Sequence, residues 1–132
     1  LSKSSKNVLR GLHFQNPPFA QGKLVSVLRG SVLDVAVDIR KNSPTYGQHY
    51  SIVLSEENKT QFYIPPGFAH GFKTLEDNTI FSYKCTVGYN KDSEGSIKWD
   101  DETLGIDWQV NNPIVSEKDK VAPSFIELES QF

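Results

Sequence analysis

Hydrophobic and polar side chains alternate along much of this chain. The alternation between Ser31 and Arg40 is strict, with Leu33, Val35, Val37 and Ile39 on one side and Val32, Asp34, Ala36 and Asp38 on the other. A period of two residues is that of a β-strand, whose successive side chains point to opposite faces of a sheet. We therefore expect one face of this strand to pack in a core and the other to line a partly polar space.

Short runs rich in β-branched and aromatic residues recur along the chain and predict further strands. With the first, these are residues 8–14, 23–28, 31–40, 49–54, 61–64, 70–75, 79–86 and 96–99. Turn-forming residues separate the runs, and Arg29-Gly30 is expected to form the tight turn of a hairpin between the second and third. Only residues 116–119 favour a helical turn, with Ser116 as its N-cap and Pro123 as its stop.

The pattern indicates an all-β protein, either an antiparallel sandwich or a barrel. A barrel of about eight strands can hold one small ligand at its mouth. Length and composition fit a single domain over residues 1–132, since 37% of the side chains are hydrophobic and 11% aromatic. That content is enough to fill a core without metal or disulfides.

Charge and cysteine content exclude several classes of protein. The net charge of −2 gives no general field for nucleic acid or an anionic membrane, so we expect neither partner. No apolar run is long enough to span a membrane and no leader opens the chain, which favours a cytoplasmic protein. The single cysteine, Cys85, excludes an internal disulfide, fits a reducing compartment and is expected to be a small buried hydrophobic residue.

Three histidines, His13, His49 and His70, are candidates for chemistry. They are too far apart in sequence for the usual spacing of metal ligands, so we expect no metal. We expect His49 at the surface and His70 beside a barrel mouth, because His70 follows a rigid Pro-Pro-Gly turn. A bulge at Gly11 would bring Arg10 and His13 to one face of their strand.

Motifs for dinucleotides, phosphate loops and nucleophilic serines are missing, so we expect no cofactor. Proton transfer by histidine, tyrosine, lysine and carboxylate side chains remains. Alternation places Phe81, Tyr83 and Cys85 on one side of their strand, which turns Tyr83 inward. On spacing alone, Tyr83 is equally well a core tyrosine with a satisfied hydroxyl or a residue of the site.

Five segments of the chain stand out together. They are residues 9–15 (LRGLHFQ), 30–40 (GSVLDVAVDIR), 65–72 (PPGFAHGF), 83–86 (YKCT) and 116–123 (SEKDKVAP). In this order they resemble the dTDP-4-dehydrorhamnose 3,5-epimerase family over nearly the whole chain. The resemblance implies a cupin-type jelly roll, a homodimer, a dTDP-sugar substrate, and catalysis without metal or cofactor.

The resemblance also implies roles for individual residues. The catalytic ones are His13 as general base, Asp119 as the carboxylate that orients it, Tyr83 as general acid on the opposite face of the sugar, and Lys23 beside the ketone oxygen. The substrate-binding ones are Arg10, His70, Glu94 and Lys118, largely at the diphosphate, and Tyr89, which closes the site. Asp34 resembles a pocket carboxylate that partners Lys23, and a structural ion pair explains it equally well.

Members of the family carry a further N-terminal segment, with a Gln-x-Asn element and an Asp-x-Arg-Gly element that contributes to the neighbouring subunit's site. This chain begins after both, so we expect its domain to lack that segment. Thymidine binding and exchange between subunits would suffer from the loss. The centre formed by His13, Tyr83 and Lys23 would be intact.

These residue types suit proton transfer beside a ketone. Removing a proton from C3 or C5 of dTDP-4-dehydro-6-deoxy-D-glucose places negative charge on the same C4 oxygen, so one cationic group serves both epimerisations towards dTDP-4-dehydro-L-rhamnose. Histidine is a suitable base near neutral pH. The alternatives are a C3-only or C5-only epimerase of an antibiotic deoxysugar pathway, a 3,4-ketoisomerase, and an inactive nucleotide-sugar-binding cupin.

Overall fold

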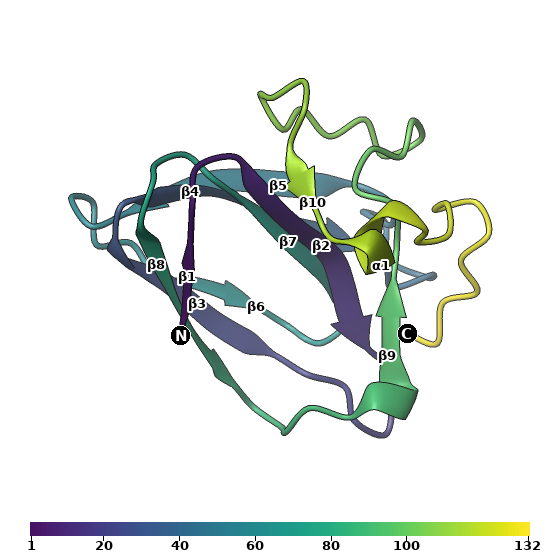
Figure 1. Ribbon diagram of the computed structural model, residues 1–132. Coiled ribbons are helices and arrows are strands. Elements are labelled where there is room, and N and C mark those ends of the chain that lie inside the picture. Colours follow the sequence, from purple (N-terminus) through teal and green to yellow (C-terminus); the bar gives the residue numbers. More distant parts are fainter.

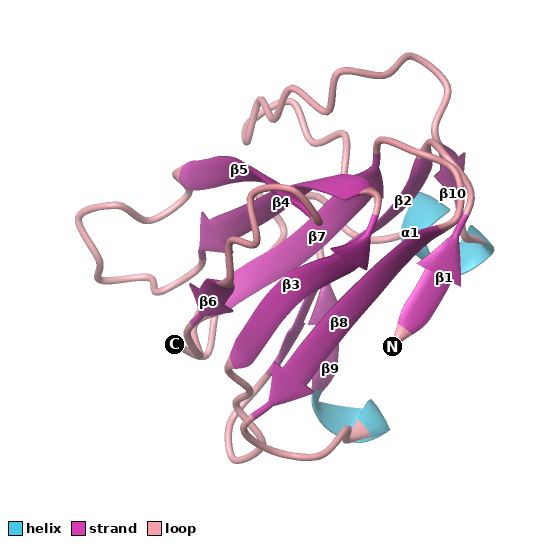
Figure 2. Cartoon of the chain, turned by 90° about the vertical axis from the view of Figure 1, so that its left-hand side faces the viewer, coloured by secondary structure: helices cyan, strands magenta, loops and turns pink.

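Two facing β-sheets make up most of the computed structural model, which describes residues 1–132 (Figure 1). One sheet has the strand order β1-β8-β3-β6, and the other follows β10-β2-β7-β4-β5, with β9 also paired to β2; Figure 2 shows them as two layers. The elements are β1 (Ser2–Ser4), β2 (Val8–Gln15), β3 (Lys23–Arg29), β4 (Ser31–Asp38), β5 (His49–Ser55), β6 (Phe62–Ile64), β7 (Phe68–Thr74), β8 (Thr79–Cys85), the 3-10 helix η1 (Lys91–Ser93), β9 (Glu94–Ser96), β10 (Ile114–Val115) and α1 (Glu117–Lys120). The predicted all-β class is confirmed.

Most predicted strands agree with the structure to within a few residues. The exception is the strand expected at residues 96–99, because the strand there is β9 and ends at Ser96. Ile97 still exchanges two backbone hydrogen bonds with Leu12, so the chain remains beside β2 without continuing as a strand. Strands β1 and β10 were not predicted, since three and two residues are too few for a periodic pattern. The helical turn is confirmed, with Ser116 as the N-cap of α1.

The predicted hairpin at Arg29-Gly30 is wrong. Gly30 does form a tight turn, with a φ of +84° that a side chain would make costly. However, β3 pairs with β6 and β8, whereas β4 pairs with β5 and β7, so the turn carries the chain from one sheet to the other. A local turn signal fixes where the chain bends but not which strands pair.

Strand β4 contributes to two hydrophobic cores, one on each face. Val32 and Ala36 belong to the core between the sheets. On the opposite face, alternate residues pack in a second core with Trp108 and Phe125 of the C-terminal part of the chain. These residues are Leu33, Val35, Val37 and, just after the strand, Ile39. The predicted difference in polarity is confirmed, because the inter-sheet face also carries Asp34 and Asp38, but this face is as fully buried as the other. No helix of this chain has the length and apolar character needed to cross a membrane.

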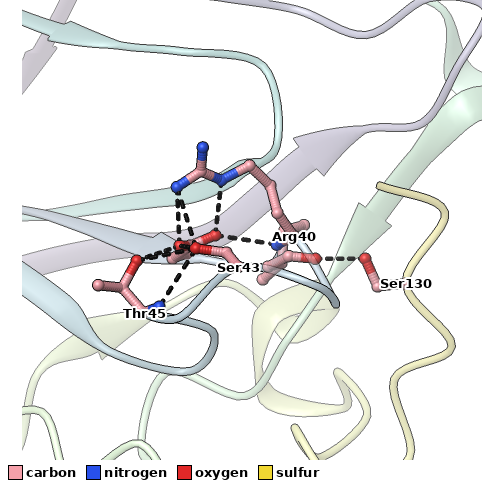
Figure 3. Close-up of polar contacts among 6 residues, drawn as sticks. Arg40, Ser43, Thr45 and Ser130 are labelled. Carbon is pink, nitrogen blue, oxygen red and sulfur yellow. Dashed lines mark hydrogen bonds and ion pairs between the residues drawn. The ribbon is translucent and has the colours of Figure 1, made fainter.

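The side chain of Asp38, at the end of β4, is the centre of a dense polar network. Figure 3 labels its partners Arg40, Ser43 and Thr45. Its buried carboxylate accepts two hydrogen bonds from the Arg40 guanidinium, at 3.0 and 2.9 Å, and further bonds from the hydroxyls of Ser43 and Thr45. Burial by itself would raise the pKa of Asp38, but these bonds outweigh it and hold the pKa far below its ordinary value. The network therefore fixes the turn that leads from β4 towards β5.

We expect Asp38→Asn to lower the free energy of unfolding at pH 7 by about 2 kcal/mol, because it removes charge-assisted hydrogen bonds in a buried position. The folded-state pKa of Asp38 is depressed, so its contribution is present above the unfolded-state pKa and disappears as pH falls towards the folded-state value. Urea unfolding at pH 7 and pH 3 should show the difference between wild type and variant shrinking in acid. The control Asp100→Asn changes an exposed carboxylate and should have little effect. An equal loss in both variants would contradict this account.

Candidate active site

A cleft of about 460 Å³ opens between the two sheets. Seven of the predicted site residues line it: Arg10, His13, Lys23, His70, Tyr83, Tyr89 and Glu94. The other three do not line the cleft, but each contacts a residue that does: Asp34 bonds to His70, Asp119 to His13, and Lys118 to Glu94. The fold therefore brings all ten predicted residues to one place, from segments far apart in the sequence.

The His13 side chain forms a close pair with Asp119. His13 Nε2 lies 2.6 Å from Asp119 Oδ1. The pairing of β2 with β7 shifts register between Arg10 and His13, as predicted for a bulge at Gly11, and both side chains reach the cleft. A Cβ at Gly11 would lie 2.6 Å from the Gly71 Cα, so only glycine permits this close approach of the strands.

The Asp119 carboxylate is positioned by backbone as well as by His13. It lies on the single turn α1, where the Ser116 hydroxyl accepts a hydrogen bond from the Asp119 N–H. The Gly11 N–H donates to Asp119 Oδ2 at 3.2 Å. Burial would raise the pKa of Asp119, but the hydrogen bond and charge of His13, with the contacts of Gly11 and Ser116, lower the pKa below its usual value. Asp119 is thus kept ionised beside the imidazole.

Tyr83 stands on the wall opposite His13, because β8 belongs to the other sheet. Tyr83 is 48% exposed, and its hydroxyl has no hydrogen-bond partner in the chain. Phe81 and Cys85 line the cleft beside it, which confirms the predicted alternation along β8. Tyr83 is therefore not a core tyrosine, and its hydroxyl is free to meet a ligand.

Lys23 lies at the start of β3, directly opposite Cys85 of β8. Burial lowers the pKa of Lys23, while the proximity of Cys85 and Asp34 acts in the opposite direction. Cys85 itself is exposed and lines the cleft, so the expectation of a buried hydrophobic cysteine is wrong. The alternation along β8 correctly predicted the side of the strand on which the Cys85 side chain lies. Cys85 is nevertheless exposed, because β8 ends there at the cleft and no side chain covers it.

Asp34 pairs with His70 and not with Lys23, which corrects the expected partner. His70 Nε2 lies 3.0 and 2.9 Å from the two carboxylate oxygens of the fully buried Asp34. No ion pair joins Asp34 to Lys23. The imidazole of His70, with Phe81 stacked near it, forms the floor of the cleft. His49, by contrast, is exposed and outside the cleft, as predicted.

The rim of the cleft carries charged and aromatic groups. Arg10 is exposed, lines the cleft and makes no ion pair within the chain. Lys118 forms an ion pair with Glu94, so its charge is already partly balanced. Tyr89 is 66% exposed. No group of three metal-ligating side chains gathers anywhere in the chain, and the absence of a metal stays a prediction.

Comparison with known proteins identifies the family. The profile of dTDP-4-dehydrorhamnose 3,5-epimerase matches residues 1–127. This chain belongs to the dTDP-4-dehydrorhamnose 3,5-epimerase family. The chain is 58% identical over 123 residues to the Salmonella typhimurium enzyme of that name, covering 92% of this chain and 67% of the relative.

Solved structures of 3,5-epimerases share the fold. The enzyme from Elizabethkingia anophelis superposes with a TM-score of 0.94 at 57% identity, covering 96% of this chain and 70% of that one. The Legionella pneumophila enzyme, in complex with dTDP-4-keto-L-rhamnose, gives 0.92 at 52% identity, covering 97% and 68%. The chain thus spans about two thirds of the length of these epimerases, and the cupin-type jelly roll implied by the resemblance is confirmed.

Two polar residues at the cleft of this 3,5-epimerase family member were not predicted from the sequence as site residues. Gln15 and Gln21 line the cleft, and their side-chain amides bond to the backbone near Tyr89. Glutamine has no pattern of its own in a strand or loop, and the residues beside Tyr89 to which Gln15 and Gln21 bond lie more than sixty residues away in the sequence. Only the proximity of Gln15 to His13 hinted at a place near the site.

Proposed function

We propose that this chain epimerises C3 and C5 of dTDP-4-dehydro-6-deoxy-D-glucose, giving dTDP-4-dehydro-L-rhamnose. The main support is one arrangement: the His13–Asp119 pair faces the free hydroxyl of Tyr83 across a cleft that also holds Lys23. A base and an acid on opposite walls are what inversion at a carbon beside a ketone requires. The names of the close relatives point to the same reaction.

His13 is proposed to remove the proton from the sugar. Its Nε2 is engaged by Asp119, which leaves Nδ1 without a partner in the chain to receive the proton. The C–H bond breaks, and its electron pair forms a double bond between that carbon and C4. The π electrons of the carbonyl move onto the C4 oxygen, where negative charge develops. Asp119, ionised and buried, then stabilises the imidazolium that forms.

Lys23 is proposed to stabilise the developing oxyanion. A half-buried ammonium group beside that oxygen acts more strongly than it would in water, because the surrounding dielectric is low. Tyr83 then donates its phenolic proton to the carbon from the opposite face, which inverts it. Exchange with solvent returns the proton to Tyr83 and removes the one on His13. The same groups serve C3 and C5 in turn, and no step needs a metal or cofactor.

The test is product stereochemistry. We expect incubation of the chain with dTDP-4-dehydro-6-deoxy-D-glucose to give a product inverted at both C3 and C5, read by proton NMR. Inversion at one carbon only would identify a C3-only or C5-only epimerase. Movement of the carbonyl to C3 would identify a 3,4-ketoisomerase, and unchanged sugar with measurable binding would identify a binding protein.

The diphosphate contacts make a graded prediction. Arg10→Ala should weaken dTDP binding by roughly tenfold or more, because a free guanidinium can bind phosphate through two parallel hydrogen bonds. Lys118→Ala should cost less, since Lys118 is a point charge already paired with Glu94. Isothermal titration calorimetry with dTDP measures both. Equal losses, or a larger loss for Lys118→Ala, would place the diphosphate elsewhere.

We also propose that the protein works as a homodimer. Strands β5 and β6 each form one edge of their sheet and carry the exposed apolar side chains Tyr50, Val53 and Tyr63. Such edges are usually covered in native proteins. Light scattering should give a mass of twice 14.8 kDa. A monomeric mass at micromolar concentration would overturn this proposal.

A cytoplasmic location is proposed as well. Cys85 is an exposed free thiol at the cleft, and such a thiol is maintained in a reducing compartment.

A further inference from the structure

The segment of residues 86–90 follows β8, belongs to no strand and carries Tyr89 at the rim of the cleft. The Tyr89 side chain makes no hydrogen bond, and most of it is exposed. Its place beside the cleft is therefore set by the backbone on either side of it. That backbone is held by the side chains of two glutamines from the ends of β2 and of the loop before β3.

Gln15 bonds to the residues immediately before and after Tyr89. Its Nε2 donates to the carbonyl oxygen of Gly88 at 3.2 Å, and its Oε1 accepts from the N–H of Asn90 at 3.1 Å. The second hydrogen of Nε2 goes to the carbonyl of Phe19 at 2.9 Å. Gln15 is almost fully buried, with 4% of the residue exposed. The side-chain amide of Gln15 thus uses both of its N–H hydrogens and its oxygen in hydrogen bonds to backbone groups.

Gln21 holds the same segment one residue earlier. Its Nε2 donates to the Val87 carbonyl at 2.9 Å. Next to it, Gly22 and Thr86 are joined by two hydrogen bonds, from the Thr86 N–H to the Gly22 carbonyl and from the Gly22 N–H to the Thr86 hydroxyl. These bonds lie at the end of the pairing between β3 and β8. Beyond Thr86 the backbone has no strand partner, and it bonds instead to the side chains of the two glutamines.

We propose that Gln15 and Gln21 form an amide clamp that positions Tyr89 and thereby sets the affinity of the cleft for the nucleoside-diphosphate part of the substrate. Both are positioning residues, because they act on the ligand through Tyr89. The clamp bonds neither to His13 and Tyr83, which are proposed to move protons, nor to Lys23, which is proposed to stabilise the oxyanion. Its loss should therefore raise KM and leave kcat nearly unchanged. This inference rests on the proposed function and on the role that the family resemblance implies for Tyr89, which is to close the site over the substrate.

The clamp is tested by replacing one glutamine with an apolar side chain of similar length. Gln15→Met leaves the Gly88 carbonyl and the Asn90 N–H without their buried partner, and we expect dTDP binding to weaken by about tenfold. Gln61→Met is the matched control, since Gln61 is exposed and makes no side-chain hydrogen bond. It should bind dTDP as wild type does. Should Gln15→Met fail to fold, Gln21→Met carries the same test.

A double-mutant cycle separates positioning from general loosening of the cleft. If Gln15 acts through Tyr89, Gln15→Met should change dTDP affinity by less than twofold in a Tyr89→Ala background. Additive losses would overturn the proposal, as would a fall in kcat larger than the rise in KM. Affinity is measured with dTDP, and kcat and KM are measured with the dTDP-sugar.

Hydrogen exchange keeps this test separate from that of the proposed function. In Gln15→Met the Asn90 amide loses its acceptor, so exchange in the segment of residues 86–90 should accelerate at least tenfold relative to Gln61→Met. A wild-type chain that binds no dTDP would refute the proposed function, whereas unchanged exchange in Gln15→Met would refute the clamp.

Discussion

His13→Asn is expected to abolish both deuterium uptake at the sugar and inversion, with a loss of roughly 10² to 10⁴-fold in each. Asparagine preserves a polar side chain near Asp119 but has no group that accepts a proton near neutral pH. Without abstraction, neither exchange nor epimerisation begins. The loss should be seen at every pH where wild type is active, because asparagine supplies no base at any of them.

The measurement is proton NMR of the sugar in deuterium oxide, with substrate in large excess. His49→Asn serves as the control, because His49 is exposed and lies outside the cleft. It should exchange and invert at the wild-type rate. If His13→Asn still exchanged deuterium at an appreciable rate, another base would be acting in the cleft.

Tyr83→Phe is expected to uncouple exchange from inversion. The variant keeps the His13–Asp119 pair and Lys23, so a proton can still leave the sugar and a deuteron can return from His13 to the same face. It lacks the hydroxyl that donates from the opposite wall. We therefore expect deuterium at C3 and C5 with inverted product reduced by roughly 10² or more.

Tyr46→Phe removes the hydroxyl of a tyrosine that packs against Phe125, outside the cleft, and is the matched control. Comparing deuterium content with stereochemistry in the same sample makes the result independent of enzyme stability, since a destabilised protein loses both together. Normal inversion by Tyr83→Phe would show that tyrosine is not the acid.

The strands were predictable because their signal is local. In β4 each face has its own composition, and in β8 the alternation of Phe81, Tyr83 and Cys85 gave the direction of all three side chains. The hairpin at Gly30 was not predictable in the same way. A positive φ at that glycine is a local property, whereas the separation of β3 and β4 into different sheets depends on strands distant in the sequence.

The members of the site were predictable from the resemblance, but several of their contacts were not. Asp34 pairs with His70 because β4 and β7 lie side by side in a register that places Ala36 opposite His70. That register is invisible in the sequence. The exposure of Cys85 and the pairing of Lys118 with Glu94 likewise depend on where strands end and which loops meet at the cleft.

The central claim is that one cleft abstracts and returns protons at two carbons flanking the same ketone. Incubation of the wild-type chain with dTDP-4-dehydro-6-deoxy-D-glucose in deuterium oxide tests it most directly, with deuterium content measured separately at C3 and C5. The account predicts that both carbons of the inverted product carry one solvent deuteron each. Inverted product without deuterium at C3 or C5, or deuterium at only one of them, would contradict it.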